Sequence, residues 1–201
     1  MIERFHPYFG EKNRLEIHRI FTELADFIHK HEIKQIIGAG SSAQPYAVAL
    51  GLAYEKRHGK PMKVFSLGEV GEKLHEVEDP KQYLQKMRPK LAHDKKSLLL
   101  EEFIDTGKKI LKLSRVFTKL KIPHKTATIS MRDPNPDHYA GIDYLGISSE
   151  SFPWFIARGY NLRKSRKTQD TRETKQILET MRDIRKELND VAKNVPPFRE
   201  E

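Results

Sequence analysis

The sequence contains no cysteine, and none of its apolar runs approaches the length of a membrane-spanning helix. The absence of cysteine excludes a disulfide framework and thiolate chemistry. A spanning helix needs about 20 consecutive apolar residues, and residues 1–10 also lack the basic and apolar regions of a secretory signal. We therefore expect a soluble, cytoplasmic protein without a membrane partner.

With 201 residues, the chain is long enough to form one domain with its own core. Its formal charge of +9 results from 37 lysine and arginine residues against 28 acidic ones. A basic surface suits either nucleic acid or small polyanionic substrates, and charge alone does not choose between them. One dense basic cluster lies at Arg163–Lys167, whereas most other charges are typical of a solvated face.

Apolar patterning alternates between short strands and longer amphipathic helices. Strands are predicted at 33–38, 62–67, 98–101 and 125–129, and helices at 13–31, 45–57, 106–120 and 170–193. This alternation predicts an α/β fold, in which a parallel sheet carries helices on both faces and binds ligands at the carboxyl ends of its strands. The long polar segment 68–96, with one helical piece at 81–87, is interpreted as a lid or a disordered loop.

One stretch combines acids, a glycine and the start of a helix: Glu101-Glu102-Phe103-Ile104-Asp105-Thr106-Gly107-Lys108-Lys109. It follows an apolar run and precedes a helical pattern, which predicts a strand end, a tight loop and the first turn of a helix. Backbone N–H groups freed by Gly107 can converge there on an anion at the positive end of the helix. The pattern therefore indicates a site for a phosphorylated sugar.

This stretch resembles the phosphoribosyl pyrophosphate (PRPP) signature of type I phosphoribosyltransferases. The resemblance implies that Glu101 and Glu102 hold the ribose hydroxyls or a magnesium-bound water, so Mg²⁺ is the expected cofactor and these two acids its expected ligands. It also implies that Asp105 lies beside the base as the catalytic residue. The residues implied to wrap the 5′-phosphate are Thr106, Gly107, Lys108 and Lys109. Two positions depart from the pattern, since the second acid is usually aspartate and Lys109 stands where a threonine is common.

A second turn of small residues, Gly40-Ser41-Ser42, also lies between a predicted strand and a predicted helix. Its N–H groups would lie on the same rim of the sheet. In phosphoribosyltransferases this position is the pyrophosphate-binding loop, so the resemblance implies that Gly40, Ser41 and Ser42 bind PRPP. A plain helix start explains the same residues equally well.

The run Ile142-Asp143-Tyr144-Leu145-Gly146 resembles the hood of hypoxanthine and xanthine-type phosphoribosyltransferases, a small segment that covers the base. The resemblance implies that Tyr144 stacks on the base and that the backbone at Leu145 reads its edge. Arg132 stands near the position of a lysine that holds an exocyclic oxygen, and Trp154 stands where an acid is usual. A purine or another flat nitrogen base is therefore expected. Tyr144 and Trp154 could instead be core aromatics of a strand.

An apolar seam spaced alternately by four and three residues runs along the predicted C-terminal helix: Ile177, Met181, Ile184, Leu188 and Val191. It is too short to define a coiled coil, so the helix is expected to lie on its own domain or on a second subunit of a homodimer. We divide the chain into a phosphoribosyltransferase-like domain at 1–170, which includes the N-terminal helix and the hood, and a C-terminal helix with its tail at 171–201.

The favoured interpretation is an enzyme that transfers a phosphoribosyl group from PRPP to a nitrogenous base, such as a purine in salvage, and releases pyrophosphate. Asp105 would accept the proton of the base or form a hydrogen bond with it. The alternative is a catalytically inactive regulator that senses PRPP or a nucleotide and binds nucleic acid through Arg163–Lys167.

Overall fold

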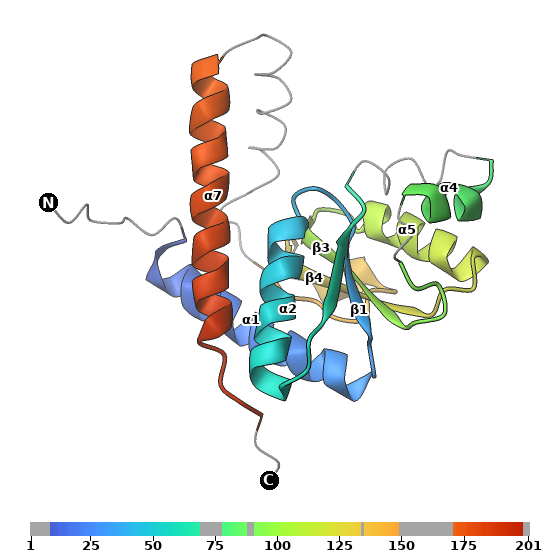
Figure 1. The fold of residues 1–201 in the computed structure, drawn as a ribbon, viewed down its shortest axis with the longest axis horizontal. Helices are drawn as coiled ribbons and strands as arrows, with labels where there is room; N and C mark the ends of the chain where they lie inside the picture. The colour runs from blue at the N-terminus through green and yellow to red at the C-terminus, as the bar shows by residue number, and fades with distance from the viewer. Residues whose placement is uncertain (1–8, 69–77, 88–90, 134, 149–170, 199–201) are drawn as a thin grey trace, which may run out of the picture.

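The computed structural model describes residues 9–68, 78–87, 91–133, 135–148 and 171–198 (Figure 1). Within them, parallel strands form one sheet in the order β2-β1-β3-β4-β5. The strands are β1 Gln35–Gly38, β2 Lys63–Ser66, β3 Ser97–Ile104, β4 His124–Met131 and β5 Ile147–Ser148. The predicted α/β class with a parallel sheet is confirmed.

Helices cover both faces of this sheet, as predicted (Figure 1). They are α1 Gly10–Lys30, α2 Gln44–His58, α4 Pro80–Met87, α5 Lys108–Lys119, the short 3₁₀ helix η1 Pro136–Tyr139, and α7 Thr171–Lys193. No helix in the described part of the chain is long and apolar enough to cross a membrane.

The central strand β3 shows how one run of leucines supplies two cores. Parallel strands buried on both faces read as continuous apolar runs, and successive side chains point to opposite faces. Leu98 and Leu100 pack with α1, α2 and α7, whereas Leu99 packs with α4 and α5. The sheet therefore separates two apolar layers.

The first layer contains both the earliest and the latest helix of the described chain. Helix α1 carries a stripe of apolar side chains at helical spacing that are fully buried: Ile17, Ile20, Phe21, Leu24 and Ile28. On α7, Ile184, Leu188 and Val191 are buried in the same core. The C-terminal helix thus packs on its own chain, and the backbone N–H of Phe9 donates to Glu187 Oε2 of α7 at 3.2 Å.

The segment after α7 returns to the ends of α1 and α2. Arg57 donates from Nε and Nη2 to the two carboxylate oxygens of Asp26, at 2.6 and 2.8 Å. The backbone N–H of Phe198 donates to the carbonyl oxygen of Arg57 at 2.8 Å. The Phe198 ring lies 5.1 Å from that of His58, which stacks on His29 at 4.4 Å with nearly parallel planes. These contacts hold the tail against the first layer.

Strand β3 extends three residues beyond the end predicted at residue 101. Its apolar Phe103 and Ile104 pair with Ser130 and Met131 of β4, because an apolar pair beside a neighbouring strand favours continued pairing over a turn. The expectation that the two acids form the end of a strand is corrected accordingly. Glu101 and Glu102 lie inside the strand, and the loop begins at Asp105.

Candidate functional site

The candidate site lies at the carboxyl ends of β1 and β3, which are neighbours in the sheet. The chain leaves β1 through α2 on one face and leaves β3 through α5 on the other. Such a reversal creates a crevice outside the strand ends, where α/β proteins bind ligands. The two predicted phosphate loops, Gly40–Ser42 and Thr106–Lys109, follow these two strands.

Direct contacts show that these loops meet. A Cβ atom added at Gly40 would lie 2.5 Å from Lys109 Nζ and 3.6 Å from Glu101 Oε1. A Cβ atom added at Gly68, just after β2, would lie 3.6 Å from Ser41 Oγ. The turns after β1, β2 and β3 therefore come together on one rim of the sheet.

An ion pair occupies the junction of the two loops. Lys109 Nζ lies 3.2 Å from both Glu101 Oε1 and Glu101 Oε2. The Glu101 side chain is 3% exposed, whereas the Lys109 side chain is 47% exposed. A buried carboxylate is stabilised by a nearby cation, so Lys109 both neutralises Glu101 and presents a positive charge at the rim.

Glu102 is buried as well, but it does not join Glu101. Adjacent residues of a strand point to opposite faces, and the Lys109 contact places Glu101 on the face of α5. Glu102 is 1% exposed, and its carbonyl oxygen accepts a hydrogen bond from Ser130 Oγ at 3.0 Å. No group of three or more metal-ligating side chains occurs among the described residues. Chelation of one Mg²⁺ by both acids does not fit this arrangement.

The loop after β3 exposes the residues with the predicted chemical roles. Asp105 and Thr106 are exposed, and Gly107 follows with φ +66°, a left-handed conformation that a glycine adopts without strain. Gly107 forms the N-cap of α5 and provides no side-chain cap. The first N–H groups of the helix, which need partners from outside the helix, therefore point to the rim.

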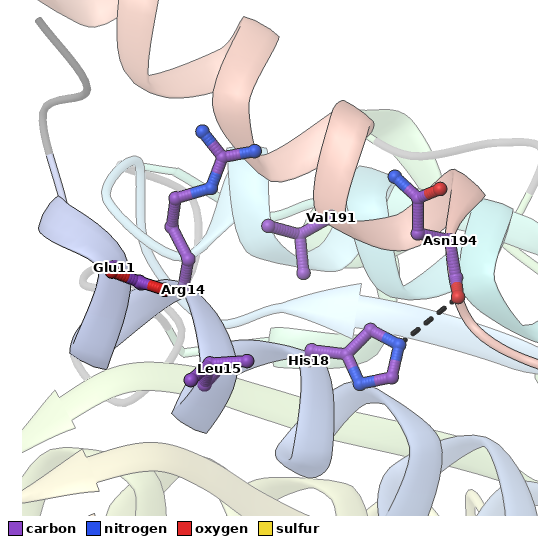
Figure 2. A pocket seen from close by; sticks show the side chains of 6 residues that line it. All are labelled: Glu11, Arg14, Leu15, His18, Val191 and Asn194. Carbon is purple, nitrogen blue, oxygen red and sulfur yellow. Dashed lines mark hydrogen bonds between the residues drawn. The ribbon is translucent and has the colours of Figure 1, made fainter.

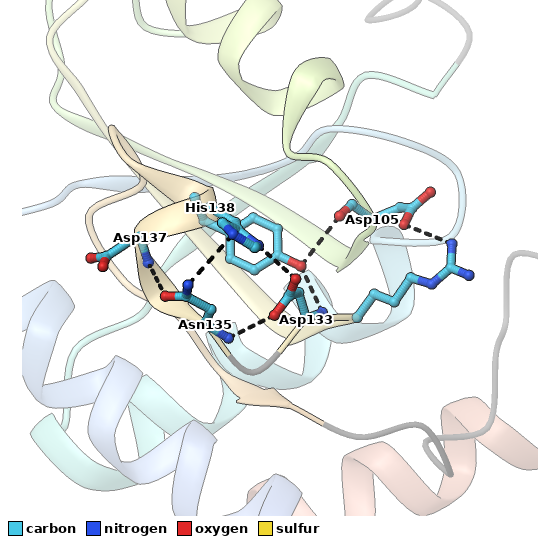
Figure 3. A network of polar contacts seen from close by, with 7 residues as sticks. Asp105, Asp133, Asn135, Asp137 and His138 are labelled. Carbon is cyan, nitrogen blue, oxygen red and sulfur yellow. Dashed lines mark hydrogen bonds and ion pairs between the residues drawn. The ribbon is translucent and has the colours of Figure 1, made fainter.

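Asp105 is held on two sides (Figure 3). Arg132, at the end of β4, donates from Nη1 to Asp105 Oδ1 at 3.0 Å, and both side chains are more than half exposed. The hydroxyl of the buried Tyr139 donates to the carbonyl oxygen of Asp105 at 3.2 Å. Two predicted site residues, Asp105 and Arg132, are thus brought together.

A polar network behind Arg132 supports this corner of the site (Figure 3). Asp133 accepts hydrogen bonds from the backbone N–H of Asn135 at 2.8 Å and from His138 Nδ1 at 2.6 Å. These two bonds, the backbone one first, hold the pKa of Asp133 below its usual value. Asn135 caps η1 by accepting from the N–H of Asp137 at 3.1 Å. The network fixes the turn that carries Arg132.

Sequence reasoning missed Tyr139 and this network. The signal was present, since an aspartate, an asparagine and a proline at the first helical position are typical of a capped turn. Pro136 occupies that position after Asn135. The pattern would have predicted a short, rigid helix at 136–139, although not its contact with Asp105.

The two hood residues lie in different places. Tyr144 pairs with Ala127 in the middle of β4, its hydroxyl donates to Glu23 of α1 at 2.6 Å, and its ring lies 5.9 Å from that of Phe27. Burial, and then the bond to Glu23, raises the pKa of Tyr144 above its usual value. Leu145 packs instead on the apolar cluster that contains Ile104, next to Asp105.

Asp143 anchors this hood segment to β4. Its carboxylate accepts from the N–H of Thr126 at 2.8 Å, from Thr126 Oγ1 at 3.0 Å and from Lys125 Nζ at 2.5 Å. Burial alone would raise the pKa of Asp143, but these bonds lower it overall. Further on, a Cβ atom added at Gly146 would lie 1.9 Å from the carbonyl oxygen of Ile129. The segment is thus held close to the sheet.

Some predicted features lie outside the described residues. They are Trp154, the basic cluster Arg163–Lys167 and two parts of the predicted lid, residues 69–77 and 88–90. Within that lid, α4 at 80–87 matches the predicted helical piece.

A separate cavity of about 380 Å³ lies between α1 and the end of α7 (Figure 2). It is lined by Glu11, Arg14, Leu15, His18, Val191 and Asn194. His18 Nε2 lies 3.1 Å from the carbonyl oxygen of Asn194 across it. None of the predicted site residues lines this cavity.

No protein-family model and no curated protein matches the chain. Among solved structures, it is similar to a purine phosphoribosyltransferase from Pyrococcus horikoshii Ot3, with 19% sequence identity and a TM-score of 0.44. The match covers 70% of this chain and 89% of that chain. A similarity of this size does not assign a function.

Proposed function

We propose that this protein binds PRPP at the crevice between β1 and β3 and transfers its phosphoribosyl group to a nitrogenous base, with release of pyrophosphate. The observation that carries the proposal is the contact of the Glu101–Lys109 ion pair with Gly40. It brings together two loops that separately have the composition of phosphate-binding turns. A ligand with phosphates at two ends of a sugar requires two such loops at one place.

Each loop would take one end of PRPP. The N–H groups at the start of α5, together with Thr106 and Lys108, would hold the 5′-phosphate, because a helix N-terminus favours an anion. The small residues Gly40, Ser41 and Ser42 would let the backbone approach the pyrophosphate. Lys109 stands between the two loops and would contact either phosphate. Mg²⁺ would accompany PRPP through the oxygens of the ligand, since this ion retains waters and uses few protein carboxylates.

The base would lie over the loop of Asp105. In the transfer, the bond from C1′ to the pyrophosphate oxygen breaks, a bond from C1′ to a base nitrogen forms, and Asp105 takes the proton of that nitrogen. Arg132 would leave Asp105 to contact the edge of the base, and Leu145 would contact its face. Because the ring of Tyr144 packs on α1, we assign Tyr144 to the support of the hood rather than to the base.

One observation favours a second candidate, a PRPP sensor without turnover. Both acids at the rim are paired with cations, Glu101 with Lys109 and Asp105 with Arg132. The Asp105 oxygen that accepts from Arg132 is occupied by that hydrogen bond and is not open to a base. Such a protein would bind PRPP and fail to release pyrophosphate with any base.

Calorimetric titration with PRPP and Mg²⁺, combined with pyrophosphate release against a panel of purines and pyrimidines, tests both candidates. For the enzyme, Asp105→Asn should lower kcat by about 10²–10⁴-fold, the usual range for loss of an acid–base group, and leave PRPP affinity nearly unchanged. Asp137→Asn is the matched control, since this exposed acid lies on the neighbouring turn. Binding without turnover would support the sensor, and absence of binding would overturn the assignment of both loops.

A further inference from the structure

The outward face of α5 carries a row of cations. Lys108, Lys112, Arg115 and Lys119 recur every three or four residues, which places them on one side of the helix. All four are exposed. From the first to the last, the row is about 16 Å long at the rise of an α-helix.

On their own helix these charges have no acidic neighbour. Helices α4 and α5, which cover one face of the sheet, contain seven lysine or arginine residues and no aspartate or glutamate. Helices α1, α2 and α7 on the other face contain twelve basic and ten acidic residues. Among the described helices, the excess of positive charge is thus concentrated on α4 and α5, and the described acids Glu78 and Asp79 precede α4 rather than α5.

The row is also free of ion pairs within the described structure. No salt bridge of Lys108, Lys112, Arg115 or Lys119 is formed with any described residue, whereas the fifth cation of α5, Lys109, turns to Glu101. On α1, by contrast, Arg19 pairs with both Glu16 and Glu23. An ordinary solvated helix face mixes both signs in this way, and the face of α5 does not.

We propose that the exposed face of α5 binds the phosphate backbone of a nucleic acid without reading its sequence. Lysine and arginine contacts to phosphate supply most of such binding and carry no base information. A straight row of closely spaced cations matches a regular line of phosphates. The proposed surface consists of α5 residues and does not include Arg163–Lys167. It shares Lys108 with the proposed PRPP site, whereas Lys112, Arg115 and Lys119 belong to the nucleic-acid surface alone.

An anionic membrane surface fits the same helix less well. Amphipathic helices that bind membranes insert an apolar side among the lipids. The apolar side of α5, formed by Ile110, Leu113, Val116 and Phe117, is buried inside the protein. The exposed positions of α5 carry only charged or polar side chains, as expected for a helix that binds a polyanion in solution.

The test is fluorescence anisotropy of the full chain with a labelled 20-base-pair DNA duplex and a labelled 20-nucleotide RNA, from 50 to 200 mM salt. Four phosphate contacts predict a slope of log K against log salt near −3.6 for the duplex, which is about a 150-fold loss across this range, and near −2.8 for the single strand. The variant Lys112→Gln/Arg115→Gln/Lys119→Gln should bind at least roughly tenfold more weakly at 50 mM salt, with a slope near −1. Its PRPP affinity, measured separately, should not change.

The control variant Lys30→Gln/Lys56→Gln/Lys60→Gln removes the same charge from exposed positions on and after α1 and α2. It should keep the slope and the affinity of the wild type, and circular dichroism should show that both variants are folded. Equal losses in both variants, no binding of either probe at 50 mM salt, or binding to vesicles of anionic lipid but to neither probe would each overturn the proposal.

Discussion

The hydroxyl of Tyr139 links the ends of two strands, since it donates to the carbonyl oxygen of Asp105 at 3.2 Å and accepts from the N–H of Asp133 at 2.8 Å. Asp105 follows β3, and Asp133 follows β4. The ring of Tyr139 is 2% exposed and packs in the cluster with Ile104 and Met131. One buried side chain thereby sets the position of the predicted catalytic residue relative to Arg132.

Tyr139→Phe removes only this link. We expect a loss of about 1–3 kcal/mol in the free energy of unfolding, because two backbone groups near the core lose their partner. If the protein is an enzyme, kcat should fall while PRPP affinity stays the same, since the phosphate loops are untouched. Urea denaturation and initial rates measure the two effects.

Tyr83→Phe provides the control for this substitution. Tyr83 is a half-buried tyrosine of α4 that packs in the other core layer, and its change should cost less than about 0.5 kcal/mol. Equal stabilities of Tyr139→Phe and the wild type would show that the link does not form in solution.

Lys109→Met should destabilise the fold by about 1–2 kcal/mol. Loss of one partner of a buried ion pair costs more than this, but Lys109 is 47% exposed and water screens part of its effect. Glu101→Gln in the same background should recover part of the loss, because the neutral amide does not need the cation. A double-mutant cycle by urea denaturation measures the coupling, and a coupling indistinguishable from zero would contradict the ion pair.

Gly146→Ala and Gly40→Ala should differ strongly in cost. At Gly146 the new methyl group would lie 1.9 Å from the backbone carbonyl oxygen of Ile129, which cannot move without disturbing β4. We expect a loss of about 3 kcal/mol or more. At Gly40 the group would meet the flexible end of Lys109 at 2.5 Å, so the lysine can move away at a cost of about 1 kcal/mol.

Thermal denaturation of these two glycine variants measures the difference. Gly40→Ala should also weaken PRPP binding in calorimetry, because the displaced lysine and the new methyl group lie where the two phosphate loops meet. A Gly146→Ala protein as stable as Gly40→Ala would mean that the hood segment lies further from β4.

The stability of the protein should fall as the pH drops below about 6.5, in part because of His58. Burial of its ring, and then the nearby His29, lower the pKa of His58 from its usual 6.5. The unfolded chain therefore binds a proton more readily, so this contribution is present above pH 6.5 and is lost as the pH falls through the lower folded pKa. His58→Phe keeps an aromatic ring beside Phe198 and cannot be protonated.

Urea denaturation at pH 7.5 and 5.5 compares the wild type with His58→Phe. The substitution should reduce the difference in unfolding free energy between the two pH values. An unchanged difference would show that His58 does not contribute to the pH dependence.

Local apolar patterns were sufficient to predict β1 to β4 and the α-helices, whereas β5 and η1 were not predicted. The apolar stripe on α1 and the leucine run of β3 each lie within a short window of sequence. Each is buried when any other apolar surface of the chain packs against it. The order of the strands, β2-β1-β3-β4-β5, was not predicted, because alternation of strands and helices is compatible with several orders. The apolar patterns need no knowledge of distant contacts, but the strand order depends on pairings between segments far apart in the sequence.

The end of β3 and the placement of Tyr144 could not be predicted in this way. Strand length there depends on pairing with Ser130 and Met131, and Tyr144 is directed by its bond to Glu23 of α1, more than 100 residues away in the sequence. A motif indicates which residue types are adjacent along the chain. It does not indicate which face of the sheet each one reaches, and this decided the separation of Glu101 from Glu102.

The packing of α7 on α1 has a consequence for synthesis on the ribosome. The chain emerges from its N-terminal end at about 5–20 residues per second, so roughly 7 to 28 seconds separate the end of α1 at Lys30 from the start of α7 at Thr171. During that time the part of α1 that α7 will cover stays open to other proteins. The nascent chain is therefore a candidate client for chaperones until α7 is released.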